Sequence, residues 1–151
     1  MLDLISKAFL KLIGGTRNER IIRGKMSYVR ERINPLEEQM RALSDAHIRE
    51  KSDELKRRRA AGEARERIKP EAFALVREAS WRAQRHRHFD VQLVAGLVLD
   101  DGWIAEEATG EGKTIACYPA IYMAALDGMH AHVVTPNDYL VKVGAEFARP
   151  V

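Results

Sequence analysis

Apolar side chains recur at helical spacing through the first half of the chain. Residues 2–13 place five of them on one face with two lysines beside them, which predicts a short amphipathic helix. Such a helix either packs on its own domain or lies on an anionic membrane surface. Residues 17–43 predict a second helix, and Pro35 marks a boundary or kink within it.

Two more helices are predicted from their end signals. Ser44 predicts the N-cap of a helix over residues 45–60, and Gly62 ends that helix. Pro70 predicts the first turn of the next helix, because proline lacks the N–H that interior helical positions donate. We expect this helix to continue through residue 82.

The pattern changes after residue 90. The apolar run 91–99 fits either a helix or a buried strand, and periodicity does not decide between them. The short segment 103–106 and the β-branched run 131–135 predict strands, with a helix over residues 115–126 between them. The expected fold class is therefore α/β, in which N-terminal helices precede the opening of a sheet-containing unit.

Composition places the chain among soluble globular proteins, with 46% hydrophobic and 31% charged residues. Uninterrupted apolar runs stay well short of a membrane span, and the N-terminus lacks the pattern of a secretory signal. Cys117 is the single cysteine, so an internal disulfide is excluded and a reducing compartment fits. The net charge of +3 suits an anionic partner, namely a nucleotide, a lipid surface or a nucleic acid.

The basic run 56–59 looks like a nucleic-acid patch when taken alone. The nearby side chains of Asp53, Glu54, Glu63 and Glu66 largely balance its charge. A solvated helix face is therefore the preferred interpretation, and we expect no nucleic-acid partner.

Residues 109–114 have the composition of a loop that wraps phosphate. Gly110 and Gly112 let the backbone approach an anion and point its N–H groups inward. Lys113 can reach the terminal phosphates, and the Thr114 hydroxyl can ligate Mg²⁺. The alternative interpretation is a glycine-rich turn that caps a helix.

Gln92 is a candidate for recognising adenine. Its amide carries both a donor and an acceptor, which matches the amino group and ring nitrogen of that base. Phe89 could buttress it, and the position upstream of the phosphate loop is typical of helicase-like motors. A surface glutamine without a role is the alternative.

Together these segments resemble the N-terminal end of the SecA family of bacterial preprotein translocase ATPases. The matching blocks occur in family order and at family spacing, most tightly over residues 70–140. They are LSD at 43–45, PEAFA at 70–74, VREAS at 76–80, RHFDVQ at 87–92, IAE at 104–106, TGEGKT at 109–114, HVVT at 132–135 and NDYL at 137–140.

The resemblance implies a RecA-like P-loop motor domain with a parallel sheet, incomplete in this chain, preceded by helices. It divides the chain into an amphipathic N-terminal helix (1–15), a helical segment (16–89) and the start of a nucleotide-binding domain (90–151). It also implies the ligand set. Gln92 would contact adenine, while Gly110, Glu111, Gly112, Lys113 and Thr114 would hold the phosphates of ATP and Mg²⁺, with Lys113 and Thr114 as catalytic residues.

The implied function is coupling of ATP hydrolysis to translocation of preproteins through the SecYEG channel. The implied partners are that channel, unfolded preproteins and anionic phospholipid, and the full-length protein is expected to allow a homodimer. The implied location is the cytoplasm and the cytoplasmic face of the bacterial inner membrane, as a peripheral protein.

The sequence departs from the family pattern at several positions. Glu107 and Ala108 replace a methionine and a basic residue, Pro136 replaces a valine, and Val143-Gly144 replaces a basic–acidic pair. The acidic motif that positions Mg²⁺ is expected beyond Val151, so these residues alone should not hydrolyse ATP. The alternative function is a non-enzymatic remnant or a membrane- or partner-docking module with weak or no nucleotide binding.

Overall fold

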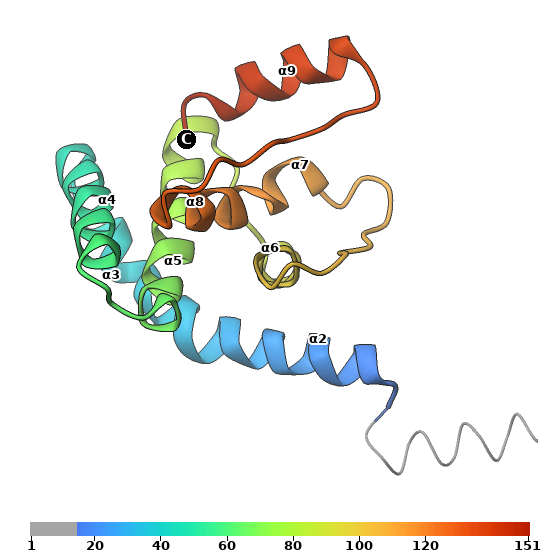
Figure 1. Cartoon of the computed structure of the whole chain (residues 1–151), viewed down its shortest axis with the longest axis horizontal. Coiled ribbons are helices and arrows are strands. Elements are labelled where there is room, and N and C mark those ends of the chain that lie inside the picture. Colours follow the sequence, from blue (N-terminus) through green and yellow to red (C-terminus); the bar gives the residue numbers. More distant parts are fainter. Residues whose placement is uncertain (1–14) are drawn as a thin grey trace, which may run out of the picture.

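Residues 15–151 are described in the computed structural model, and helices form all the regular secondary structure among them (Figure 1). The expected helix over residues 2–13 lies outside the described residues. The elements in chain order are α2 (Arg17–Tyr28), the π-helical η1 (Val29–Ile33), the 3-10 turn η2 (Asn34–Leu36), α3 (Glu37–Arg41), α4 (Asp45–Ala60), α5 (Arg65–Gln84), α6 (Asp90–Asp100), α7 (Lys113–Ala116), α8 (Tyr118–Leu126) and α9 (Asp138–Ala148).

The α/β prediction with a parallel sheet is wrong for this part of the chain. Residues 103–106 and 131–135 have no regular secondary structure, and neither segment pairs with another in the described range. A strand requires a neighbour for its backbone groups, and apolar residues alone do not provide one. The consequence is exposure of apolar side chains, since Ile104 is 95% exposed and Val134 is 90% exposed.

Local signals predicted several helix ends correctly. Ser44 caps α4, because its side chain accepts the His47 N–H at 3.2 Å. Pro35 lies in the 3-10 turn that divides the predicted helix over 17–43. The ambiguous apolar run 91–99 is helical and lies within α6.

The predicted start of the next helix at Pro70 is wrong by more than a turn. Helix α5 begins at Arg65 and places Pro70 in its interior. The additional turn is held by α6, because Arg65 pairs with Asp100 and Lys69 Nζ lies 2.9 Å from an oxygen of the same carboxylate. Tertiary ion pairs therefore outweigh the preference of proline for a first turn.

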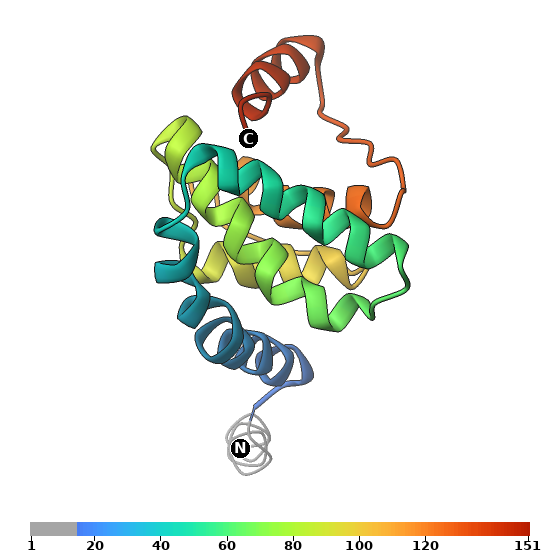
Figure 2. The same cartoon turned by 90° about the vertical axis from the view of Figure 1, so that its left-hand side faces the viewer.

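Helix α5 lies at the centre of the bundle and contacts η1, η2, α3, α4 and α8, and α6 packs on α8 and α2 (Figure 2). The core contains fully buried side chains from both halves of the chain, including Phe73, Leu55, Leu93 and Met123. Gly96 permits the close approach of α6 to the segment after the loop. A Cβ there would lie 3.0 Å from the Ala116 carbonyl oxygen and 3.3 Å from the Phe73 ring.

The basic run on α4 is largely engaged in ion pairs. Arg58 contacts Glu54, Glu63 and Glu71 at 2.7–3.1 Å, and Arg59 Nη2 lies 2.5 Å from Asp127. Glu54 and Glu63 were predicted to balance this charge, whereas Glu71 and Asp127 were not. The prediction of a solvated face is wrong for Arg58 and Arg59, which are half-buried at helix contacts.

Helix α9 lies apart from the bundle at the end of the extended segment that follows α8 (Figure 1). Its C-terminal end returns to the segment that follows α5, where Phe147 packs edge-on against His86 at 5.6 Å between ring centroids. Asn137 caps its start, with the side chain accepting the Leu140 N–H at 2.9 Å.

Candidate nucleotide site

The end of the loop between α6 and α7 contains two glycines with a left-handed backbone. Gly110 and Gly112 adopt left-handed conformations with φ of +90° and +85°. Gly112 is the N-cap of α7, so the first N–H groups of that short helix have no intrahelical acceptors. The loop is exposed, and its residues can therefore meet a ligand from solvent.

Gln92 and the loop lie in direct contact, although they are 19 residues apart. The Gln92 Nε2 donates to the Glu111 carbonyl at 2.7 Å. Its Oε1 accepts the Phe89 N–H at 2.9 Å, as glutamine often does at the third position of a helix. The sequence predicted that Phe89 could buttress this side chain. The backbone of Phe89 does so, while its ring is 68% exposed.

The Gln92 amide also accounts for a glycine at position 112. A Cβ on Gly112 would lie 2.3 Å from Gln92 Nε2, in addition to the strain of a left-handed backbone. Any larger residue would displace the amide from the loop. The side chain proposed for the base and the loop proposed for the phosphates thus form one interlocked unit.

Lys113 and Thr114 are exposed at the start of α7. The Lys113 Nζ donates to the Ala108 carbonyl at 2.7 Å and so folds back over the loop. Glu107 is half-buried nearby. Burial raises the pKa of its carboxyl, the charge of Lys113 opposes this, and the charge of Glu111 adds to it. The acid at position 107 is therefore less readily ionised than a solvated glutamate.

His88 links the segment before α6 to the first turn of α7. It is fully buried, and its Nε2 lies 2.7 Å from the Ile115 carbonyl oxygen. Burial lowers its pKa to about 4, helped by the charges of Arg77 and Arg87. The ring is neutral at pH 7, so its Nε2 must carry the proton and donate to the carbonyl.

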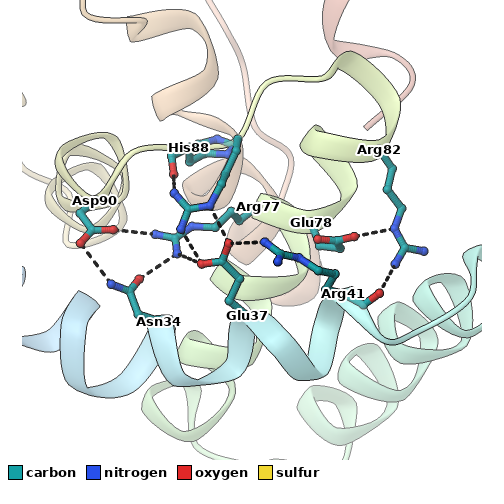
Figure 3. Close-up of polar contacts among 9 residues, drawn as sticks. Asn34, Glu37, Arg41, Arg77, Glu78, Arg82, His88 and Asp90 are labelled. Carbon is teal, nitrogen blue, oxygen red and sulfur yellow. Dashed lines mark hydrogen bonds and ion pairs between the residues drawn. The ribbon is translucent and has the colours of Figure 1, made fainter.

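A partly buried network of polar side chains also holds the start of α6 (Figure 3). Arg77 donates to Asn34 Oδ1 at 2.8 Å and to Asp90 Oδ1 at 3.2 Å, while Asn34 Nδ2 donates to Asp90 Oδ2 at 3.1 Å. Arg87 forms a bidentate pair with Glu37 at 2.5–2.6 Å. These bonds fix the position of Asp90, which precedes Gln92 by two residues in α6.

The sequence did not predict roles for His88 or for this network. Its members come from η2, α3, α5, the segment before α6 and the first residue of α6, so no local spacing brings them together. The signal available was the RHFDVQ block at 87–92, whose first four residues turn out to anchor the helix that carries Gln92.

None of the helices between residues 15 and 151 is long and apolar enough to cross a membrane. The same residues contain no group of three or more His, Cys, Asp or Glu side chains placed to hold a metal ion.

Comparisons with known proteins agree on a family. Residues 9–151 match the SecA DEAD-like domain. The protein translocase subunit SecA of Coxiella burnetii is 50% identical over 149 residues, which are 99% of this chain and 16% of that protein. The SecA subunits of Ralstonia pickettii and Neisseria meningitidis serogroup A are 51% and 52% identical over 91% and 93% of the chain. The chain spans 15–16% of the length of these relatives.

Proposed function

Because the chain belongs to the SecA family, we propose that it binds ATP and serves as the nucleotide-binding part of a motor that translocates preproteins. The observation that carries this proposal is the 2.7 Å bond from Gln92 to the Glu111 carbonyl. It joins the expected base-recognition residue to the expected phosphate loop.

Each residue of the proposed site has a chemical task. The Gln92 side chain is buried and bonded to Phe89 and Glu111, so in this proposal it turns its amide to the adenine edge when the nucleotide binds. The backbone of Gly110, Glu111 and Gly112 directs N–H groups at the phosphates. Lys113 exchanges its neutral carbonyl acceptor for a phosphate oxygen, which is a stronger, charge-assisted bond. Thr114 places its hydroxyl for Mg²⁺. That ion, when bound, neutralises charge between the terminal phosphates.

Adenine selectivity gives a direct prediction. Gln92→Ala should weaken ATP binding more than GTP binding, because an unpaired base edge costs about 1–3 kcal/mol. Titration calorimetry with both nucleotides measures the two losses. Gln39→Ala, an exposed residue on α3, is the matched control and should change neither affinity. Equal losses of ATP and GTP affinity would show that Gln92 does not recognise adenine. Its role would then be structural, through its contacts with Phe89 and Glu111.

The wider function is proposed from the family. In this proposal the motor acts with the SecYEG channel on unfolded preproteins, in the cytoplasm and as a peripheral protein on the inner membrane, and the full-length protein forms a homodimer. The relatives are named protein translocase subunits, which supports this assignment. The ion pairs of Arg58 and Arg59 support a function without nucleic acid. Loss of preprotein transport into inverted vesicles on Lys113→Ala in the full-length protein tests the proposed activity.

We also propose that the N-terminal segment, residues 1–15, binds anionic phospholipid. A peptide of residues 1–15 should gain helical circular dichroism on vesicles that contain phosphatidylglycerol and little on neutral vesicles. Its apolar face and lysines both contribute, with about 1 kcal/mol per basic residue near the surface. A peptide with Lys7 and Lys11 changed to glutamine is the control and should lose the preference. Equal binding of the unchanged peptide to both vesicle types would favour packing within the protein.

A further inference from the structure

His88 holds the short helix that follows the phosphate loop. Its side chain is fully buried, and its Nε2 donates to the Ile115 carbonyl oxygen at 2.7 Å. Ile115 belongs to α7, the four-residue helix that begins with Lys113 and Thr114. The bond therefore ties the two side chains proposed for the phosphates and Mg²⁺ to the segment that precedes α6.

The sequence leaves the Ile115 carbonyl without its usual helical donor. In a continuous helix this carbonyl would accept the N–H of the residue four positions on, but that residue is Pro119, which has no N–H. Its backbone contact is the Cys117 N–H, two positions on. His88 supplies a second donor from 27 residues earlier in the chain. The position of α7 therefore depends on a side chain outside the helix.

Histidine is an unfavourable residue for this interior position. When Nε2 carries the proton, Nδ1 is an acceptor, and it is buried without a hydrogen-bond partner among residues 15–151. An apolar side chain would fill the same space without an unmatched nitrogen. The contribution that an apolar side chain cannot make is the bond from Nε2 to α7.

Two bonds from one short segment bracket the loop. The Gln92 Nε2 donates to the Glu111 carbonyl, and the His88 Nε2 donates to the Ile115 carbonyl, both at 2.7 Å. The residues proposed for the terminal phosphates and Mg²⁺ lie between these two points. In the proposed function Gln92 turns its amide to adenine, and its bond to the loop is then lost. Of the two bonds, the one from His88 remains.

The segment that carries His88 is itself fixed at both of its ends. Arg87 forms its bidentate pair with Glu37 on one side of the histidine, and Asp90 accepts from Arg77 on the other (Figure 3). A side chain on such a base can hold α7 in place while the loop exchanges its own contacts for those of a ligand.

We propose that His88 is a positioning residue of the nucleotide site, an inference that rests on the proposed binding of ATP. It keeps α7 in register with the start of α6 while Gln92 exchanges the Glu111 carbonyl for adenine. ATP spans both parts of the site, so a displaced α7 loses the gain from simultaneous base and phosphate contacts. Adenosine and tripolyphosphate each meet one part alone, and neither depends on this register.

The test compares two amides at position 88 of the 151-residue chain. His88→Gln places an amide nitrogen about as far from the backbone as the imidazole Nε2, whereas the amide of His88→Asn is too short to reach the carbonyl. We expect His88→Asn to weaken ATP binding by about tenfold or more, while His88→Gln stays within about threefold of wild type. Affinities for adenosine and tripolyphosphate should change by about twofold or less in both variants, because each ligand needs one part of the site.

Calorimetry measures ATP binding, and ligand-observed NMR measures the two weaker ligands. Tyr118→Phe is the matched control, because it keeps the ring that lies edge-on to His88 at 6.2 Å between centroids. It should leave ATP affinity unchanged. Circular dichroism establishes that each variant keeps its helices. Equal losses for all three ligands in His88→Asn, or equal ATP affinities of the Gln and Asn variants, would overturn the inference.

A measurement on the unsubstituted chain needs no variant to fold. The His88 Nε2–H should give a slowly exchanging imidazole resonance in NMR spectra, and this resonance should persist when ATP is bound. Its disappearance on ATP binding would show that the bond breaks and would refute the positioning role alone. A chain that binds no ATP would instead refute the proposed function, and this inference with it.

Discussion

Replacing Glu37 by glutamine is expected to lower the free energy of unfolding by about 1.5–3 kcal/mol, the contribution of a hydrogen bond to a charged group. The change removes the carboxylate that accepts from Arg87 and Arg77 and leaves both guanidinium groups without it. Arg77 is the more costly of the two, since its side chain is almost wholly buried. Chemical denaturation at pH 7 measures the difference.

The neighbouring residue provides the control. Glu38→Gln removes an exposed carboxylate from the same helix and should change stability by about 0.5 kcal/mol or less.

The difference in free energy of unfolding between wild type and Glu37→Gln should also depend on pH. The bonds from Arg87 hold the pKa of Glu37 below its ordinary value of 4.5. Its contribution is therefore complete above pH 4.5 and is lost as the pH falls through the lower, folded-state pKa. A constant difference down to pH 2 would contradict this role.

Lys113→Ala is expected to weaken ATP binding by about ten- to a hundredfold, because a charge-assisted bond contributes about 1.5–3 kcal/mol. The lysine is exposed, and its Nζ is held by the Ala108 carbonyl, a neutral acceptor that a phosphate oxygen can replace. Its removal should therefore leave the fold intact. Lys56→Ala, on the exposed face of α4, is the control for loss of one positive charge. Unchanged ATP affinity in the Lys113 variant would remove this residue from the site.

Helix positions were predictable where short-range chemistry decides them. The Ser44 cap joins residues three apart, and Pro35 acts through its own missing N–H. The predicted strands failed for the opposite reason. The apolar sequence at 131–135 is suited to a sheet, but a strand also needs a partner, and none lies beside it within residues 15–151. The start of α5 at Arg65 depends on Asp100, which lies 35 residues further along the chain.

The candidate site shows the same division. The composition of residues 109–114 predicted a glycine-rich loop, and two of its glycines have the left-handed backbone that such a loop requires. The contact between Gln92 and that loop could be expected only from a family resemblance. The network around Arg77 joins residues 13 to 43 positions apart, and charge patterning alone gave no reason to pair them.

Titration calorimetry of the 151-residue chain with ATP and Mg²⁺ tests whether the chain binds nucleotide. We expect saturable binding at one site per chain, weaker binding of GTP, and loss of most of the affinity in Lys113→Ala. A wild-type chain that keeps its helical circular dichroism but releases no binding heat with millimolar ATP at two temperatures would contradict the account. The chain would then be a docking module whose phosphate loop serves only to turn the backbone into α7.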